Sequence, residues 1–117
     1  MDKITIWHNP RCSKSREAMS ILEENGCEIE VIKYLEVEPT KEQITTVLSM
    51  LGCSVREWMR TKEDIYKELN LKNQEDEQKL IEAMVMHPKL IERPVLIKNN
   101  KAIIGRPTSI IAEFINS

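Results

Sequence analysis

The sequence predicts an α/β fold in which helices cover a mixed four-stranded sheet. One observation is a strand, a helix and a second strand in close succession, over Lys3–Trp7, Ser13–Asn25 and Glu28–Tyr34. A crossover of this length joins parallel strands and is right-handed. The other observation is a strand pair near the C-terminus, Val95–Ile97 and Ala102–Ile104, followed by a closing helix. Together the two segments supply all four strands.

The N-terminal elements follow from simple patterns. An apolar run that begins at Lys3 has the length of a buried strand. Apolar residues then recur at helical spacing from Ser13 to Asn25, and Gly26 follows as a helix stop signal. From Glu28 onwards apolar and charged residues alternate, which is typical of a second strand.

The middle of the chain is expected to be helical and contains no strand candidate. Thr40 and Gln43 fit a capping box at the start of a helix that stops at Gly52. Ser54 and Glu57 repeat the capping pattern. Later helices are expected over residues 65–69 and 75–86. We therefore predict a single domain, 1–117, with a helical insertion at about residues 40–88 between the second and third strands.

The C-terminal segment is expected to form a hairpin and a helix. Asn99-Asn100 between two apolar runs is a hairpin turn signal. Residues Pro107 to Ile115 form the closing helix. Without the helical insertion, the order βαβ followed by ββα is that of a thioredoxin-like core. Cys12 then lies at the first strand-to-helix junction.

Composition excludes several classes of protein. A net charge of −2 argues against a nucleic-acid or membrane-surface partner, which would favour a basic chain. No apolar run approaches the length of a membrane span, and the N-terminus lacks a signal core, so a cytoplasmic protein is expected. Three scattered cysteines form neither a disulfide framework nor a zinc motif, so we predict no metal. Nothing in the sequence indicates more than a monomer.

Cys12 is the strongest candidate for chemistry. It lies in a polar loop between a strand and a helix, where first-turn N–H groups and the helix dipole stabilise a thiolate. Arg11, Lys14 and Arg16 add positive charge nearby. A buried structural thiol would be inert, so this setting predicts a nucleophile.

Three further arginines stand out by their context. Arg93 enters the predicted hairpin and Arg106 leaves it, so an antiparallel pairing would place them side by side. Converging guanidinium groups indicate an anionic ligand such as a tetrahedral oxyanion. Arg60 lies in the helical insertion among charged neighbours, where a solvated helix face is an equally good interpretation. Pro94, directly after Arg93, has the place of the cis proline that faces the reactive cysteine in thioredoxin-like folds.

These residues resemble the glutaredoxin-dependent arsenate reductases, the ArsC family of thioredoxin-like proteins. The resemblance covers essentially the whole chain and is closest to the subgroup with the loop Asn9-Pro10-Arg11-Cys12-Ser13-Lys14-Ser15-Arg16. Further matching positions are His8, Tyr34-Leu35-Glu36, Arg60, Arg93-Pro94 and Gly105-Arg106-Pro107.

The resemblance implies a role for each site residue. Cys12 would be the nucleophile, and His8 would help to lower its pKa. Arsenate, and then arsenite, would bind to Arg60, Arg93 and Arg106. The anion loop would be shaped by Asn9, Ser15 and Arg16. No cofactor would be bound, glutathione would serve as thiol co-substrate, and glutaredoxin would be the protein partner in arsenic detoxification.

Other functions compete with this one. The phosphatase type of arsenate reductase needs Cys-x5-Arg, and the arginine position is Ala18 here, which excludes it. Spx-like regulators share the fold and bind RNA polymerase, but their redox switch is commonly Cys-x-x-Cys, whereas this chain has Ser15. A monothiol glutaredoxin-like thiol-disulfide reductase fits Cys12-x-x-Ser15 and would need a glutathione groove, which the sequence does not reveal.

Overall fold

The computed structural model describes residues 3–105 and 108–116, which form two compact units. One unit contains the described residues up to Val37 and from Arg93 onwards, and the other is Glu38–Glu92. The helical unit therefore extends slightly beyond the insertion expected at about 40–88. Among the described residues, no helix combines the length and apolar character needed to cross a bilayer.

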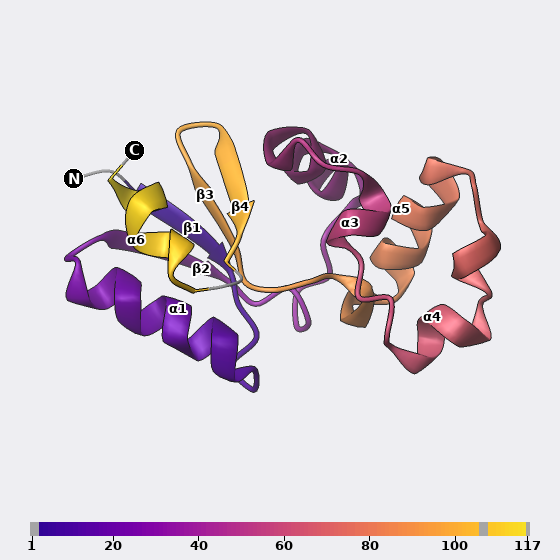
Figure 1. Ribbon diagram of the computed structural model, residues 1–117, viewed down its shortest axis with the longest axis horizontal. Helices are drawn as coiled ribbons and strands as arrows, with labels where there is room; N and C mark the ends of the chain where they lie inside the picture. The colour runs from indigo at the N-terminus through magenta and orange to yellow at the C-terminus, as the bar shows by residue number, and fades with distance from the viewer. Residues whose placement is uncertain (1–2, 106–107, 117) are drawn as a thin grey trace. The chain divides into compact units, whose positions relative to one another are not determined.

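The first unit is built on a four-stranded mixed sheet (Figure 1). Its strands are β1 (Lys3–Trp7), β2 (Glu28–Ile32), β3 (Val95–Lys98) and β4 (Lys101–Ile104), in the order β2-β1-β3-β4. The pair β1–β2 is parallel, whereas β3 is antiparallel to both β1 and β4. The predicted α/β class and strand arrangement are confirmed.

Two helices cover one face of this sheet, α1 (Ser13–Glu24) and α6 (Ile110–Ile115) (Figure 1). Because side chains alternate along a strand, Ile4 and Ile6 of β1 point to the same face. They form a buried core with Ala18, Leu22, Leu96, Ile111 and Phe114. Helix α1 thus has a fixed position on the sheet, and so does the loop that precedes it.

The second strand is shorter than expected, which is a correction to the predicted range Glu28–Tyr34. It ends at Ile32, because the chain turns at Lys33, whose carbonyl accepts the N–H of Glu36 at 3.0 Å. Tyr34 is buried and stacks on Trp7 with ring centroids 6.2 Å apart. Lys33 therefore belongs to a loop at the carboxyl end of β2.

The C-terminal hairpin has the predicted turn. Asn99 and Asn100 adopt left-handed φ values of 50° and 64°, which a two-residue hairpin turn of this type requires. Past the paired strands, the N–H of Gly105 donates to the carbonyl of Pro94 at 2.8 Å. The Arg93–Pro94 peptide bond is cis, as predicted. The closing helix begins at Ile110, later than expected.

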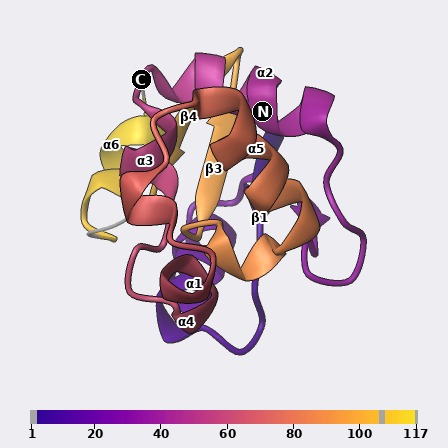
Figure 2. The same cartoon turned by 90° about the vertical axis from the view of Figure 1, so that its right-hand side faces the viewer.

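The second unit is helical, as predicted (Figure 2). Both capping boxes are present, at Thr40 and at Ser54. The helices are α2 (Lys41–Leu51), α3 (Val55–Trp58), α4 (Asp64–Glu68) and α5 (Glu77–Met86), with short 3-10 segments η1 (Leu71–Asn73) and η2 (Pro88–Leu90). Helix α5 packs against α2 and α3. An isolated β-bridge between Met59 and Ile91, which the sequence did not indicate, joins the segment after α3 to the end of this unit.

Candidate active site

Cys12 occupies the N-cap position of α1. Its extended backbone, with φ −92° and ψ 124°, turns the chain from the loop into the helix, and its carbonyl accepts the N–H of Arg16 at 3.0 Å. The residue is 9% exposed. The described first turn of α1 carries no acidic residue that would oppose a negative charge on the sulfur. The N-terminal end of the helix dipole therefore favours a thiolate here.

The surroundings lower the pKa of the Cys12 thiol below its ordinary value. Burial acts in the opposite direction and raises it, but the backbone N–H of Ser15, the Arg93 side chain and the backbone N–H of Lys14 together outweigh burial. A thiolate, rather than a thiol, is the nucleophilic form of cysteine. The surroundings of Cys12 therefore favour the form of the side chain that can act as a nucleophile.

The Ser15 hydroxyl organises the loop before Cys12. Ser15 is fully buried, and its Oγ accepts the backbone N–H of Asn9 at 3.1 Å and lies 2.6 Å from Nδ1 of His8. Since the hydroxyl already accepts one hydrogen bond, its own proton is available to the imidazole. The backbone N–H of Ser15 thus stabilises the Cys12 thiolate, and its hydroxyl holds the loop through His8 and Asn9.

The His8 ring is held by Ser15, through the contact of its Nδ1 with the Ser15 hydroxyl. Burial, followed by the nearby Lys33 ammonium, lowers the pKa of His8. The neutral ring is therefore favoured at pH 7, with Nδ1 accepting from Ser15 and the proton on Nε2, a tautomer assigned from this hydrogen bond. The groups that lower the Cys12 pKa do not include His8. A direct effect of His8 on the thiol stays a prediction.

Asn9 and Arg16 brace the same loop. The Asn9 side-chain oxygen accepts the backbone N–H of Arg11 at 3.0 Å, and the Asn9 carbonyl accepts the N–H of Cys12 at 3.0 Å. From the helix, the Arg16 guanidinium donates to the Pro10 carbonyl at 3.4 Å. These bonds hold residues 9–12 in a tight turn.

The three arginines predicted to bind the anion differ in where they lie. Of the predicted arginines that the structure describes, Arg93 acts on Cys12, through a side-chain hydrogen bond and its charge. Arg106 lies outside the described residues. Arg60 belongs to the helical unit.

Arg60 follows the β-bridge at Met59 rather than lying on a helix face. Its Nε lies 3.0 Å from a Glu63 oxygen, and its Nη1 lies 2.9 Å from a Glu92 oxygen. Burial would lower the pKa of Arg60, but the two carboxylates raise it overall. The guanidinium is thus charged and held between two acids, so an anion would have to compete with them.

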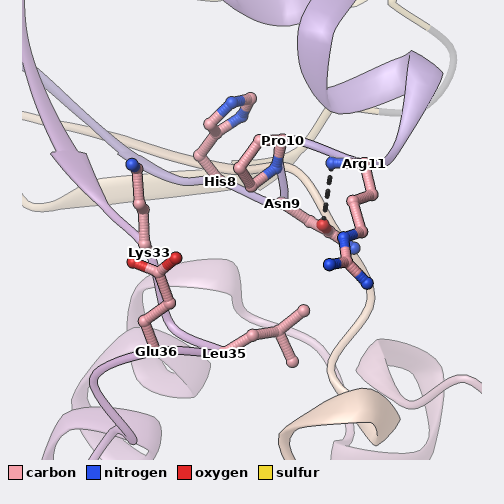
Figure 3. Close-up of a pocket in the computed structure, with 7 residues that line it drawn as sticks. All are labelled: His8, Asn9, Pro10, Arg11, Lys33, Leu35 and Glu36. Carbon is pink, nitrogen blue, oxygen red and sulfur yellow. Dashed lines mark hydrogen bonds between the residues drawn. The ribbon is translucent and has the colours of Figure 1, made fainter.

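A pocket of about 240 Å³ adjoins the Cys12 loop (Figure 3). Its walls come from two loops, the one after β1 and the one after β2. The lining residues are His8, Asn9, Pro10, Arg11, Lys33, Leu35 and Glu36. The carboxyl ends of neighbouring parallel strands are the usual place for ligands in open α/β sheets.

Sequence reasoning missed Lys33 and the acidic partners of Arg60. Lys33 directly follows β2, the parallel neighbour of β1, so its place at the same sheet edge as His8 was a usable signal. Glu92 gave no such signal, because its pairing with Arg60 spans 32 residues of sequence.

Comparison with known proteins gives consistent results. The chain is 50% identical over 115 residues to the uncharacterized protein YfgD of Escherichia coli (strain K12), with 97% of both chains covered. It is 49% identical over 109 residues to the arsenate reductase of Neisseria meningitidis serogroup A / serotype 4A, covering 92% of this chain and 93% of that one. The solved arsenate reductase from Vibrio cholerae matches with a TM-score of 0.92 and 46% identity, covering 96% of this chain and 97% of that one.

The family itself is also clear. The model of the ArsC family matches residues 7–114, which include the Cys12 loop and the hairpin. The similarity to the Vibrio cholerae structure extends over both units of the fold. The predicted thioredoxin-like resemblance is confirmed, and the chain belongs to the ArsC family.

Proposed function

We propose that this protein is an arsenate reductase that uses Cys12 as its nucleophile and takes further electrons from glutathione and glutaredoxin. The observation that carries the proposal is the lowered pKa of Cys12 beside the Arg93 guanidinium. A thiolate next to a fixed cation is suited to attack on an oxyanion, because the cation attracts the substrate and stabilises charge that develops on its oxygens.

The reaction balances with two thiols. The Cys12 sulfur forms a bond to As(V) of arsenate, and one arsenic oxygen leaves as water after protonation. The sulfur of a glutathione thiolate then attacks Cys12, forming a sulfur–sulfur bond as the sulfur–arsenic bond breaks. The electron pair of the broken sulfur–arsenic bond stays on arsenic, which becomes As(III) and leaves as arsenite. Glutaredoxin then takes the glutathione from Cys12 and restores the thiolate.

The positions of the other cysteines support an external second thiol. Cys27 follows the far end of α1, at least about 18 Å from Cys12 along the helix rise, whereas a disulfide needs Cα atoms within about 7 Å. Cys53 belongs to the helical unit, and burial and the nearby Glu57 carboxylate raise its pKa. Cys27 is thus too far from Cys12 along α1 to pair with it, and the surroundings of Cys53 disfavour its thiolate.

Arg93 is the best-supported anion ligand in this proposal, because it already acts on the Cys12 sulfur. Arg60 and Arg106 are assigned to arsenate by family resemblance. The names of the Neisseria meningitidis and Vibrio cholerae relatives support the same substrate.

The test is coupled NADPH oxidation with glutathione, glutathione reductase and glutaredoxin, started by arsenate. Cys12→Ser should abolish turnover, while Cys27→Ser, a matched removal of a thiol from the same unit, should leave it unchanged. Omission of glutathione or of glutaredoxin should also stop turnover. Wild-type protein that alkylates rapidly at Cys12 yet shows no arsenate-dependent turnover would refute the proposal. Turnover of a glutathione mixed disulfide by that protein would then identify a thiol-disulfide reductase.

A further inference from the structure

The pocket beside the Cys12 loop is not used by the arsenic chemistry described above. It contains about 240 Å³ and lies at the carboxyl ends of β1 and β2 (Figure 3). Typical sites for small organic ligands measure about 300–1,000 Å³. The pocket is therefore large enough for part of a short peptide, whose ends can reach the exposed charged residues around it, and too small for a large cofactor.

Three charged side chains line this pocket, two cationic and one acidic. Arg11, Lys33 and Glu36 are all exposed. None of the three side chains forms an ion pair with another described residue. In Figure 3, Arg11 lies on one side of the pocket, with Lys33 and Glu36 on the other. The charges are therefore available to a ligand from two directions.

The remaining wall is apolar or already satisfied. Pro10 and Leu35 supply apolar surface, and Leu35 is 42% exposed. His8 and Asn9 are buried, and each has a side-chain hydrogen bond, His8 with Ser15 of α1 and Asn9 with the Arg11 N–H. A ligand with charged ends and a short aliphatic middle would match both kinds of surface.

The pocket also adjoins the backbone turn that leads to Cys12. The hydrogen bond between the Cys12 N–H and the Asn9 carbonyl, 3.0 Å long, closes a turn. The ends of such a turn have Cα atoms within about 7 Å of each other. A ligand held against Asn9 and Arg11 is therefore bound by the same turn whose last residue is Cys12.

We propose that this pocket binds the peptide backbone of the thiol co-substrate, a glutathione-like tripeptide, and so delivers its sulfur to Cys12. The inference rests on the proposed function, which requires an external thiol. Glutathione carries two carboxylates and one ammonium group, which complement the two cations and one carboxylate of the pocket. Arg11 and Lys33 bind the carboxylates and Glu36 binds the ammonium.

Direct binding tests the proposal without any arsenic chemistry. S-methylglutathione cannot react with Cys12, and its dissociation constant can be measured by NMR titration of the backbone amides. Shifts should concentrate in residues 8–11 and 33–36. Lys33→Glu should raise the dissociation constant about tenfold or more, because the contact is electrostatic and lies at a partly solvated surface. Lys33→Arg keeps the positive charge, so its dissociation constant should stay within about twofold of that of wild type.

A matched variant controls for the change in net charge. Lys101→Glu makes the same charge reversal at an exposed position of β4, outside the pocket, and should bind S-methylglutathione like wild type. Equal affinities for Lys33→Glu and wild type, or an equal loss in Lys101→Glu, would overturn the proposal. So would shifts confined to residues outside the pocket.

A second readout follows disulfide exchange at Cys12. The Cys12 thiolate attacks oxidised glutathione, forming a mixed disulfide and releasing one glutathione thiolate. Lys33→Glu should slow this exchange about tenfold while iodoacetamide alkylation of Cys12, which uses no charged ligand, stays within about twofold of wild type. An equal slowing of both reactions would show an effect on the thiol instead and would overturn the proposal.

These outcomes separate the two proposals. If arsenate turnover is absent but Lys33-dependent binding of S-methylglutathione persists, the arsenate reductase assignment fails and the pocket assignment stands. If turnover is present and binding does not depend on Lys33, the pocket assignment fails and the enzyme assignment stands.

Discussion

The Ser15 hydroxyl lies 2.6 Å from Nδ1 of His8, and this contact is buried. The same hydroxyl accepts the Asn9 backbone N–H at 3.1 Å. One side chain on α1 therefore fixes the start of the loop, while its backbone N–H helps to lower the pKa of Cys12. The fit between loop and helix, rather than any single charge, keeps the sulfur at the helix end.

Removing this hydroxyl should destabilise the protein. Ser15→Ala leaves the His8 ring nitrogen and the Asn9 N–H buried without their partner, which costs about 1–3 kcal/mol. Urea unfolding should show a loss of this size in the free energy of unfolding. Ser20→Ala, the same change on the exposed face of α1, should stay within about 0.5 kcal/mol of wild type. A loss for Ser15→Ala no larger than that for Ser20→Ala would contradict the structural role.

The pH dependence of alkylation should distinguish Cys12 from Cys53. An ordinary cysteine has a pKa of about 8.5. Because its surroundings lower the pKa of Cys12, iodoacetamide should react with it well below that pH. Burial and Glu57 raise the pKa of Cys53, so its reaction should need a higher pH. Mass spectrometry of the labelled peptides measures both curves, and coincident curves would count against the proposed environment of Cys12.

Arg93 should account for part of this difference. Arg93→Gln removes a charge and a hydrogen bond from the Cys12 sulfur, so it should slow alkylation at pH 6.5 by about threefold or more, whereas Arg93→Lys should retain part of the rate.

The lowered pKa of Cys12 also determines how the free energy of unfolding depends on pH. Since the folded-state pKa is depressed, the thiolate stabilises the folded state above the unfolded pKa, and this contribution is lost as pH falls through the folded pKa. The stability difference between wild type and Cys12→Ser should show that trend.

The carboxylates around Arg60 should weaken anion binding, if Arg60 binds arsenate as proposed. Glu63 holds the guanidinium at 3.0 Å, and both side chains are partly exposed. Glu63→Gln removes one competing negative charge, so it should lower the KM for arsenate by about two- to fivefold with kcat little changed. Glu68→Gln, an exposed neutralisation in the same unit, is the control. A raised KM in Glu63→Gln would mean that Glu63 orients Arg60 instead of competing for it.

Most of the fold was predictable, because it depends on local signals. The capping boxes at Thr40 and Ser54, the Asn99-Asn100 turn and the parallel β1–β2 pair all have the predicted form. The end of β2 was wrong by two residues, since Tyr34 continues the apolar pattern of the strand. Its burial comes from stacking on Trp7, a tertiary contact that periodicity does not reveal.

The candidate site was predictable where it depends on one loop. Cys12 and its helix end follow from a strand, a polar loop and a helix in sequence. The neutral His8 does not, because its state depends on burial and on Lys33, which another strand brings near. The ion pair of Arg60 with Glu92 also depends on a contact between distant segments, whereas its pair with Glu63 is local. Sequence patterns identify residue types at a site, whereas the pairing of their charges is settled by tertiary structure.

Gly105 should be required for the close approach of the hairpin to the core. A Cβ at this position would lie 2.9 Å from Leu96 Cδ1 and 3.0 Å from Pro94 Cγ, closer than side-chain atoms normally come. Gly105→Ala should therefore lower the free energy of unfolding by about 1–3 kcal/mol. Because Gly105 also bonds to the Pro94 carbonyl, beside Arg93, alkylation of Cys12 near neutral pH should slow as well.

A double-mutant cycle with Leu96 tests whether the clash is the cause. Leu96→Val removes the methyl group that a Cβ at Gly105 would meet first, so the combined variant should lose less stability than the sum of the single variants, by about 0.5 kcal/mol or more. Gly52→Ala is the contrasting case. Gly52 has a φ of 67° and nothing within 4 Å of the added Cβ, so the stability that Gly52→Ala loses reflects backbone strain alone. This loss should add to the loss caused by Leu96→Val without coupling. An equal coupling energy with Leu96→Val at both glycines would show that these substitutions loosen the fold in general. Coupling confined to Gly105 would assign the loss of stability to the contact between this glycine and the residues that position Arg93.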